Sequence, residues 1–182
     1  MNLIGRIRRF FRNKALRRDG SKVPSGMMPV SDIRTAAFII DVEDSSFDVC
    51  KQSIQSFSRE YGMKTEIFFL DMRKIGSEDR LITSITNTIL ARDLNWFGKP
   101  SEEKMKLLLD FNPDLFVSLV KDGGFPADYV AACCTARFKI GRRQLPGKVF
   151  DLVVSDPPGK DYQEADVFGY VKNYLLKITD NK

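Results

Sequence analysis

Short apolar runs without helical period alternate along the chain with segments whose apolar residues recur every three or four positions. The run at 36–42 (AAFIIDV) contains several β-branched residues, which predicts a strand buried on both faces at the centre of a parallel sheet. Further strands are predicted at 65–70, 115–120, 137–140 and 151–154, and at 82–90 within a stretch of no clear period, before an irregular loop at 95–100.

Segments of helical period predict four helices between or after these strands. The clearest has Ser45 as its N-cap, apolar residues at steps of three and four, and Gly62 at its end. The others begin after Ser101, begin near Pro126, and run over 167–178. Helices alternating with strands predict an α/β fold: a three-layer, doubly wound, Rossmann-like sandwich with a mostly parallel sheet and right-handed crossovers.

Composition divides the 182 residues into three parts. Residues 1–19 read as a basic amphipathic helix, and residues 20–35 as a linker because glycine, proline and serine interrupt any helical pattern there. Residues 36–182 have the length of one domain and are predicted to form a single Rossmann-like unit. We therefore expect the first helix to be hinged to the body.

Charge is concentrated in the first part of the chain. Residues 1–22 hold eight basic side chains and one acidic side chain, a formal charge of +7, whereas the remaining 160 residues carry −2. This asymmetry predicts contact between residues 3–18 and a polyanion, either an anionic membrane surface or RNA. The candidate contacts are the arginines and phenylalanines of this segment: Arg6, Arg8, Arg9, Arg12, Arg17, Arg18, Phe10 and Phe11.

Three interpretations of this helix stay open at the level of sequence. Leu3, Ile7 and Phe10 recur at helical spacing, which suits burial among lipid headgroups but equally suits packing on the domain's own surface. RNA would use the arginines but has less use for the apolar stripe. The arginines interrupt any signal-peptide core, and no apolar run approaches the roughly 20 residues of a membrane span. We expect a cytoplasmic protein, or one at the inner face of the membrane.

The chemistry available to the chain is restricted. Histidine is absent, which removes the commonest general base and zinc ligand. The three cysteines, Cys50, Cys133 and Cys134, form no metal-binding spacing and are interpreted as buried thiols in a reduced compartment. Neither the dinucleotide signature nor the P-loop occurs, so the sequence predicts no particular cofactor and we assign no metal site.

In doubly wound sheets, ligands bind beyond the carboxyl ends of the strands. The loops predicted there supply a candidate ligand cleft of three carboxylates, one hydroxyl and two glycines: Asp41, Asp122, Asp156, Ser45, Gly123 and Gly124. An anion there would need a divalent cation to offset the carboxylates. The alternative is that these residues only cap helices and turn the chain.

Two local stretches resemble transferases. Residues 150–158 (FDLVVSDPP) resemble the fourth motif of amino-methyltransferases, although Gly159 stands where that family has an aromatic residue. Residues 114–119 (DLFVSL), Ala131 with Ala132, and residues 137–141 (RFKIG) are similar to the acceptor half of heptosyltransferase-like enzymes. The second resemblance implies the strand and helix order more than the activity, since the chain is too short for a second nucleotide-sugar lobe.

Most of the body, residues 36–178, resembles an uncharacterised family of short bacterial α/β proteins known only as a domain of unknown function. The loop 93–100 (DLNWFGKP), the strand 114–119 and residues 136–141 (ARFKIG) carry this resemblance. It implies a bacterial cytoplasmic protein and supplies no catalytic residues. Within the loop, Asn95, Trp96 and Phe97 form a candidate recognition loop, with a lid over the core as the alternative.

These observations favour a non-enzymatic α/β binding domain attached to an anionic surface through residues 3–18. The competing hypothesis is a small transferase or nucleotide-dependent enzyme that uses Asp41, Asp122 and Asp156 with a divalent metal. No complete catalytic motif supports the second hypothesis, so whether the protein is an enzyme stays open.

Overall fold

A computed structural model describes residues 3–73, 83–121 and 123–178. Its centre is a six-stranded sheet in the order β3-β2-β1-β4-β5-β6, and every neighbouring pair is parallel. The strands are β1 (Thr35–Asp41), β2 (Lys64–Asp71), β3 (Thr88–Leu90), β4 (Leu115–Ser118), β5 (Phe138–Gly141) and β6 (Leu152–Val153). This is the order of a doubly wound Rossmann-like sheet, with its switch point between β1 and β4.

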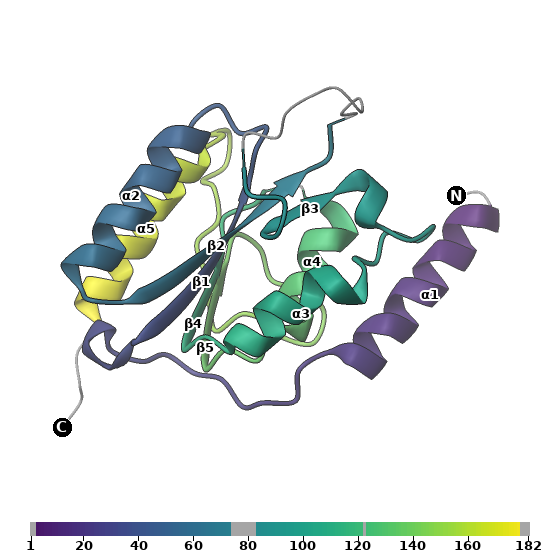
Figure 1. The fold of residues 1–182 in the computed structure, drawn as a ribbon, viewed down its shortest axis with the longest axis horizontal. Coiled ribbons are helices and arrows are strands. Elements are labelled where there is room, and N and C mark those ends of the chain that lie inside the picture. The colour runs from purple at the N-terminus through teal and green to yellow at the C-terminus, as the bar shows by residue number, and fades with distance from the viewer. Residues whose placement is uncertain (1–2, 74–82, 122, 179–182) are drawn as a thin grey trace.

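Helices cover both faces of the sheet, as Figure 1 shows. On one face lie α2 (Phe47–Glu60) and α5 (Glu164–Lys177), side by side. On the other face lie α3 (Glu102–Phe111) and α4 (Gly124–Cys133), with α1 (Leu3–Asp19) packed outside α4. Two short 3₁₀ helices, η1 (Val30–Asp32) and η2 (Ala91–Asp93), precede β1 and follow β3. The predicted three-layer α/β fold is confirmed.

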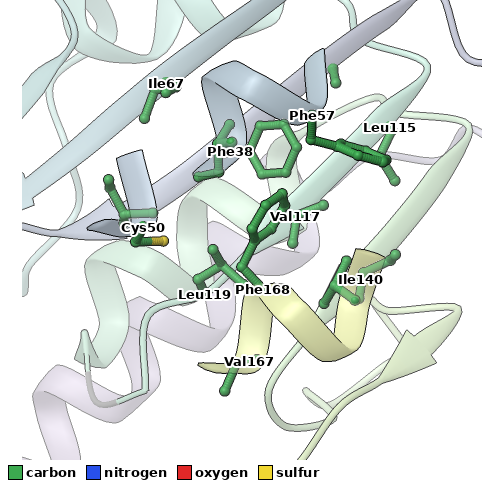
Figure 2. Close-up of a cluster of buried hydrophobic side chains, with 14 of the residues drawn as sticks. Phe38, Cys50, Phe57, Ile67, Leu115, Val117, Leu119, Ile140, Val167 and Phe168 are labelled. Carbon is green, nitrogen blue, oxygen red and sulfur yellow. The ribbon is translucent and has the colours of Figure 1, made fainter. Parts of the chain in front are cut away.

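Alternation along β1 divides the core into two clusters. Phe38 and Ile40 point towards α2 and α5, where Phe38 meets Phe168 edge-on and Phe168 meets Phe57 in the same way (Figure 2). Ala37 and Ile39 belong to the cluster beneath α3 and α4. Because successive side chains of a strand face opposite sides, a strand that is apolar at every position is one buried on both faces.

Several predicted boundaries shift by a few residues. β3 occupies only Thr88–Leu90 of the strand predicted at 82–90, and residue 82 lies outside the described residues. The N-cap residue of α2 is Ser46 and not Ser45, and its side chain makes no capping hydrogen bond. The amide and the hydroxyl of Ser46 both donate to Asp44 Oδ1. Ser101 caps α3 as predicted, accepting from the Lys104 amide.

Residues 20–35 cross the amino ends of the strands on their way from α1 to β1 (Figure 1). The Ser21 amide donates to the Ala132 carbonyl and the Gly26 amide to the Arg137 carbonyl, both at 2.8 Å. Asp114 Oδ2, just before β4, accepts from the amides of residues 34 and 35. This segment is therefore held against the body at several points. Within the described part of the chain, no helix is both long and apolar enough to cross a membrane.

Candidate anionic-surface interface

The second half of α1 docks on the body through one helical face. Arg12, Ala15 and Asp19 follow each other at steps of three and four, which places them on the same side of a helix. Ala15 is buried in the cluster beneath α3 and α4, with Leu16 packed beside it. Polar contacts of Arg12 and Asp19 also hold this half of α1 in place.

Arg12 is the first of two polar attachments. Its Nε donates to the Phe97 carbonyl at 2.7 Å, and its guanidinium lies 4.9 Å from the centre of the Phe125 ring. Burial, and after it the nearby charge of Arg8, lowers the pKa of Arg12. A Cβ at Gly98, whose φ is +94°, would lie 3.3 Å from the guanidinium, so glycine there gives both the turn and the space.

Asp19 is the second attachment and the acidic residue of the arm. Its carboxylate accepts from Arg18 at 2.6 Å, from Lys99 at 3.0 Å and from the Tyr129 hydroxyl at 2.6 Å. The hydrogen bond from Arg18, followed by those from Tyr129 and Lys99, holds the pKa of Asp19 well below its usual range. Burial and the bond to Asp19 raise the pKa of Tyr129. One carboxylate thus joins α1 to α4 and to the loop before α3.

The first half of α1 presents its apolar side chains to solvent. Leu3 is 72% exposed and Phe10 is 63% exposed, and Ile4, Ile7 and Phe11 are exposed as well. Leu3, Ile7 and Phe10 share one face, which points away from the face of Arg12 because residues two apart on a helix lie on nearly opposite sides. The alternative in which these residues pack on the domain's own surface is therefore wrong.

The predicted arginines differ in their partners. Arg6, Arg8, Arg9 and Arg17 are exposed, and none of them makes an ion pair with another described residue. Arg18 is exposed but paired with Asp19, and Arg12 is turned towards the body. Four of the six predicted arginines are thus exposed without an acidic partner among the described residues, and two of these, Arg6 and Arg17, share the face of Phe10 at steps of four and seven.

The loop of Asn95, Trp96 and Phe97 lies against α1. The Phe11 ring meets the Trp96 ring edge-on, 5.1 Å between centres, and stacks on Phe97 at 6.0 Å. Trp96 is 54% exposed, whereas Phe97 is half-buried and continues inward to Phe125. Two candidate sites that are far apart in the sequence therefore form one surface. A sequence pattern gives no signal of this contact, because it joins a helix to an irregular loop.

One residue of the predicted ligand cleft, Asp156, is already paired with two cations. Asp156 forms ion pairs with Arg142 at 2.6 Å and Lys121 at 3.0 Å. Burial alone would raise the pKa of Asp156, but the hydrogen bonds from those two cations outweigh it and the pKa is lowered. Among the described residues, no three acidic or cysteine side chains gather as a metal site, and Asp122 lies outside the described residues.

Three other cleft residues lie in turns or at the start of α4. Ser45 is exposed in the turn before α2. Gly123 is closely packed, since a Cβ there would lie 2.8 Å from both Leu70 and Ala127, and Gly124 adopts a φ of +58°. The space beside Gly123 measures only about 10 Å³, which is no more than one water needs.

Glu164 is a buried acidic residue at this edge of the sheet, and the sequence gives no sign of its burial. Both carboxyl oxygens of Glu164 accept from the Asp41 amide, at 3.0 and 3.1 Å. Burial, reinforced by the charges of Asp44 and Asp41, raises the pKa of Glu164 to about 9. Burial also raises the pKa of Asp41. An acidic residue in the first turn of a helix resembles an ordinary solvent-exposed cap, so its sequence position carried no signal of burial.

The sheet order and the helices on both faces define the class as a Rossmann-like α/β domain. The chain belongs to the Family of unknown function (DUF6913), whose model matches residues 8–178. The match covers the docked half of α1, the loop of Trp96 and the whole sheet. No curated protein matches the chain. Membership in a family of unknown function is confirmed, while the two local resemblances to transferases stay predictions.

Proposed function

We propose that this protein is a peripheral binding domain of the cytoplasm that attaches to an anionic membrane surface through the exposed face of α1. The observation that carries the proposal is the exposed face of Leu3, Ile7 and Phe10, flanked by arginines that have no acidic partner among the described residues. A large exposed apolar patch rimmed by polar residues is typical of an interaction site. Cations around it suit a partner that is both anionic and apolar.

Lipid headgroups above acyl chains have that combination. Each basic side chain near an anionic leaflet contributes about 1 kcal/mol, so Arg6 and Arg17 together supply about 2 kcal/mol at low salt. Partial burial of the apolar face adds to this, at roughly 25 cal/mol per Å² of apolar surface removed from water. Either contribution alone, electrostatic or apolar, gives weak binding. The two together give stable but reversible attachment.

RNA is the less suitable partner. Phosphates would engage the arginines, but a continuous stripe of aliphatic residues has no counterpart on a nucleic-acid backbone. The docking of the second half of α1 also favours a membrane over RNA. It keeps the exposed face on the outside of the domain, where a flat surface can reach it.

Flotation of the full-length protein with vesicles tests the proposal. We expect co-flotation with phosphatidylcholine vesicles that contain phosphatidylglycerol, and little with phosphatidylcholine alone, because the arginines require negative charge. In a parallel gel-shift assay with single-stranded RNA, we expect anionic vesicles to compete away any RNA that binds. Equal flotation with both lipids, or none with either, would contradict the proposal, as would tight RNA binding without vesicle binding.

A further inference from the structure

Resting on the proposed function, we infer that Trp96 enters the same membrane interface as α1, so that the body of the domain lies on the bilayer in one orientation instead of hanging from a flexible helix. The partner is the headgroup layer of an anionic bilayer. Four features of the loop at 95–100 lead to this assignment.

The first feature is the rigidity of the loop. The Asn95 amide donates to the Lys99 carbonyl at 2.9 Å, and Asn95 Oδ1 accepts from the amides of Phe97 at 3.2 Å and Lys99 at 2.9 Å. A β-bridge between Leu94 and Pro100 closes the base of the loop. The side chain of residue 96 is therefore displayed from a short, internally bonded turn.

The second feature is the attachment of this loop to α1 at two places. The Phe97 carbonyl accepts from Arg12, and Lys99 pairs with Asp19, two turns further along the same helix. Two attachments separated by that length fix the direction of the helix relative to the loop. Any surface that binds α1 in place therefore meets the loop at a set distance and angle.

The third feature is continuity of the apolar surface. Phe10 meets Phe11 edge-on at 5.6 Å, and Phe11 meets Trp96 in the same way at 5.1 Å. All three rings are exposed. The apolar face of α1 therefore continues through the contacting rings of Phe10 and Phe11 to Trp96.

The fourth feature is the chemistry of Trp96 itself. A large aromatic residue that leaves more than half of its surface exposed is costly in water unless a partner covers it. Tryptophan is enriched where an apolar environment meets a wet one, because its ring is apolar and its indole N–H can donate to a headgroup. The position beside the cationic helix suits that interface.

Because Trp96 is the only tryptophan of the chain, its fluorescence reports this contact directly. On adding vesicles that contain phosphatidylglycerol, we expect the emission to shift to shorter wavelength, acrylamide quenching to fall, and lipids brominated on their acyl chains to quench the signal. Flotation of the same samples separates the two claims. Flotation with an unchanged, acrylamide-accessible Trp96 would overturn the inference and leave the proposed function standing, whereas no flotation would overturn both.

Substitution of Trp96 gives a second test. We expect Trp96→Ala to weaken binding to anionic vesicles by about tenfold and Trp96→Phe by less, since the smaller ring keeps part of the apolar contact. Tyr174→Ala is the matched control, because Tyr174 is 49% exposed on α5 at the opposite face of the sheet. Circular dichroism of each variant checks the fold. Equal binding by Trp96→Ala and Tyr174→Ala, both folded, would overturn the inference.

Discussion

Arg12 Nε lies 2.7 Å from the carbonyl oxygen of Phe97, a residue 85 positions later in the chain. This hydrogen bond, with the guanidinium placed over the Phe125 ring, makes one cation of the basic helix part of the folded body. The remaining arginines of the first half of α1 stay outside. The same helix therefore has a structural face and an interaction face.

The structural role of Arg12 can be tested by Arg12→Lys. Lysine keeps the charge but lacks the planar fork that donates to Phe97 while lying on Phe125. We expect the free energy of unfolding to fall by about 1–2 kcal/mol, measured by urea denaturation. Arg9→Lys, at an exposed side chain without an ion pair among the described residues, is the control and should change it by less than about 0.5 kcal/mol. Equal stabilities for the two variants would show that Arg12 is only a surface charge.

Asp19 predicts a pH dependence of stability. Its pKa is lowered in the folded protein from the ordinary 3.8, so the stabilisation that it provides is present above pH 4 and is lost as the pH falls towards the folded pKa. We expect Asp19→Asn to lower the free energy of unfolding by about 1 kcal/mol at pH 7, since its partners are partly solvated. The difference from the unmodified protein should shrink by pH 3. A difference that is the same at both pH values would contradict this role.

Glu164 predicts the opposite slope. Its folded pKa of about 9 lies above the ordinary 4.5, so the folded protein retains a proton that the unfolded chain releases, and stability falls as the pH rises from about 4.5 to 9. Glu164→Gln keeps an oxygen for the Asp41 amide and removes the ionisable group. We expect it to raise the melting temperature at pH 8 and to leave it nearly unchanged at pH 5.

Glu164→Gln could instead prove less stable than the unmodified protein at pH 8. That result would mean that the Glu164 carboxylate is ionised and needed in that form. Asp161→Asn provides a control, because Asp161 is well exposed and pairs with Lys121. It should show no comparable gain at pH 8.

The exposed arginines should act through charge rather than through guanidinium geometry. Replacing Arg6 and Arg17 by glutamine is expected to remove about 2 kcal/mol of attraction to anionic vesicles, roughly thirtyfold in affinity, while replacement by lysine should cost little. Vesicle sedimentation at increasing sodium chloride measures the electrostatic part, which salt should screen. Retention of full binding by the glutamine variant would show that charge is not the cause.

Local sequence patterns were enough to predict the layers of this fold. The run at 36–42 is apolar at nearly every position, and β1 is one of the two central strands, with helices on both sides. Ser101 caps α3 as its position before a helical segment predicts. Such features depend on neighbours within a few residues, which a single sequence contains.

The site could be predicted only in part, because its decisive contacts are distant in the chain. Leu3, Ile7 and Phe10 were recognised as a stripe, but only coordinates show that the stripe is exposed and that Phe11 meets Trp96. The carboxylate of Asp156 was interpreted as a ligand, yet Arg142 neutralises it from the end of a neighbouring strand. Charge pairing across a sheet has no local signature, so the sequence does not show that Asp156 is paired.

The most direct measurement of the central claim compares two variants that remove exposed apolar groups. Ile7→Ser combined with Phe10→Ser changes the apolar face of α1, and Val49→Ser changes a residue of α2 that is 60% exposed. In flotation with vesicles containing phosphatidylglycerol, the double variant should lose most of its binding and Val49→Ser should keep it. Equal flotation of the two proteins, both folded by circular dichroism, would contradict attachment through α1.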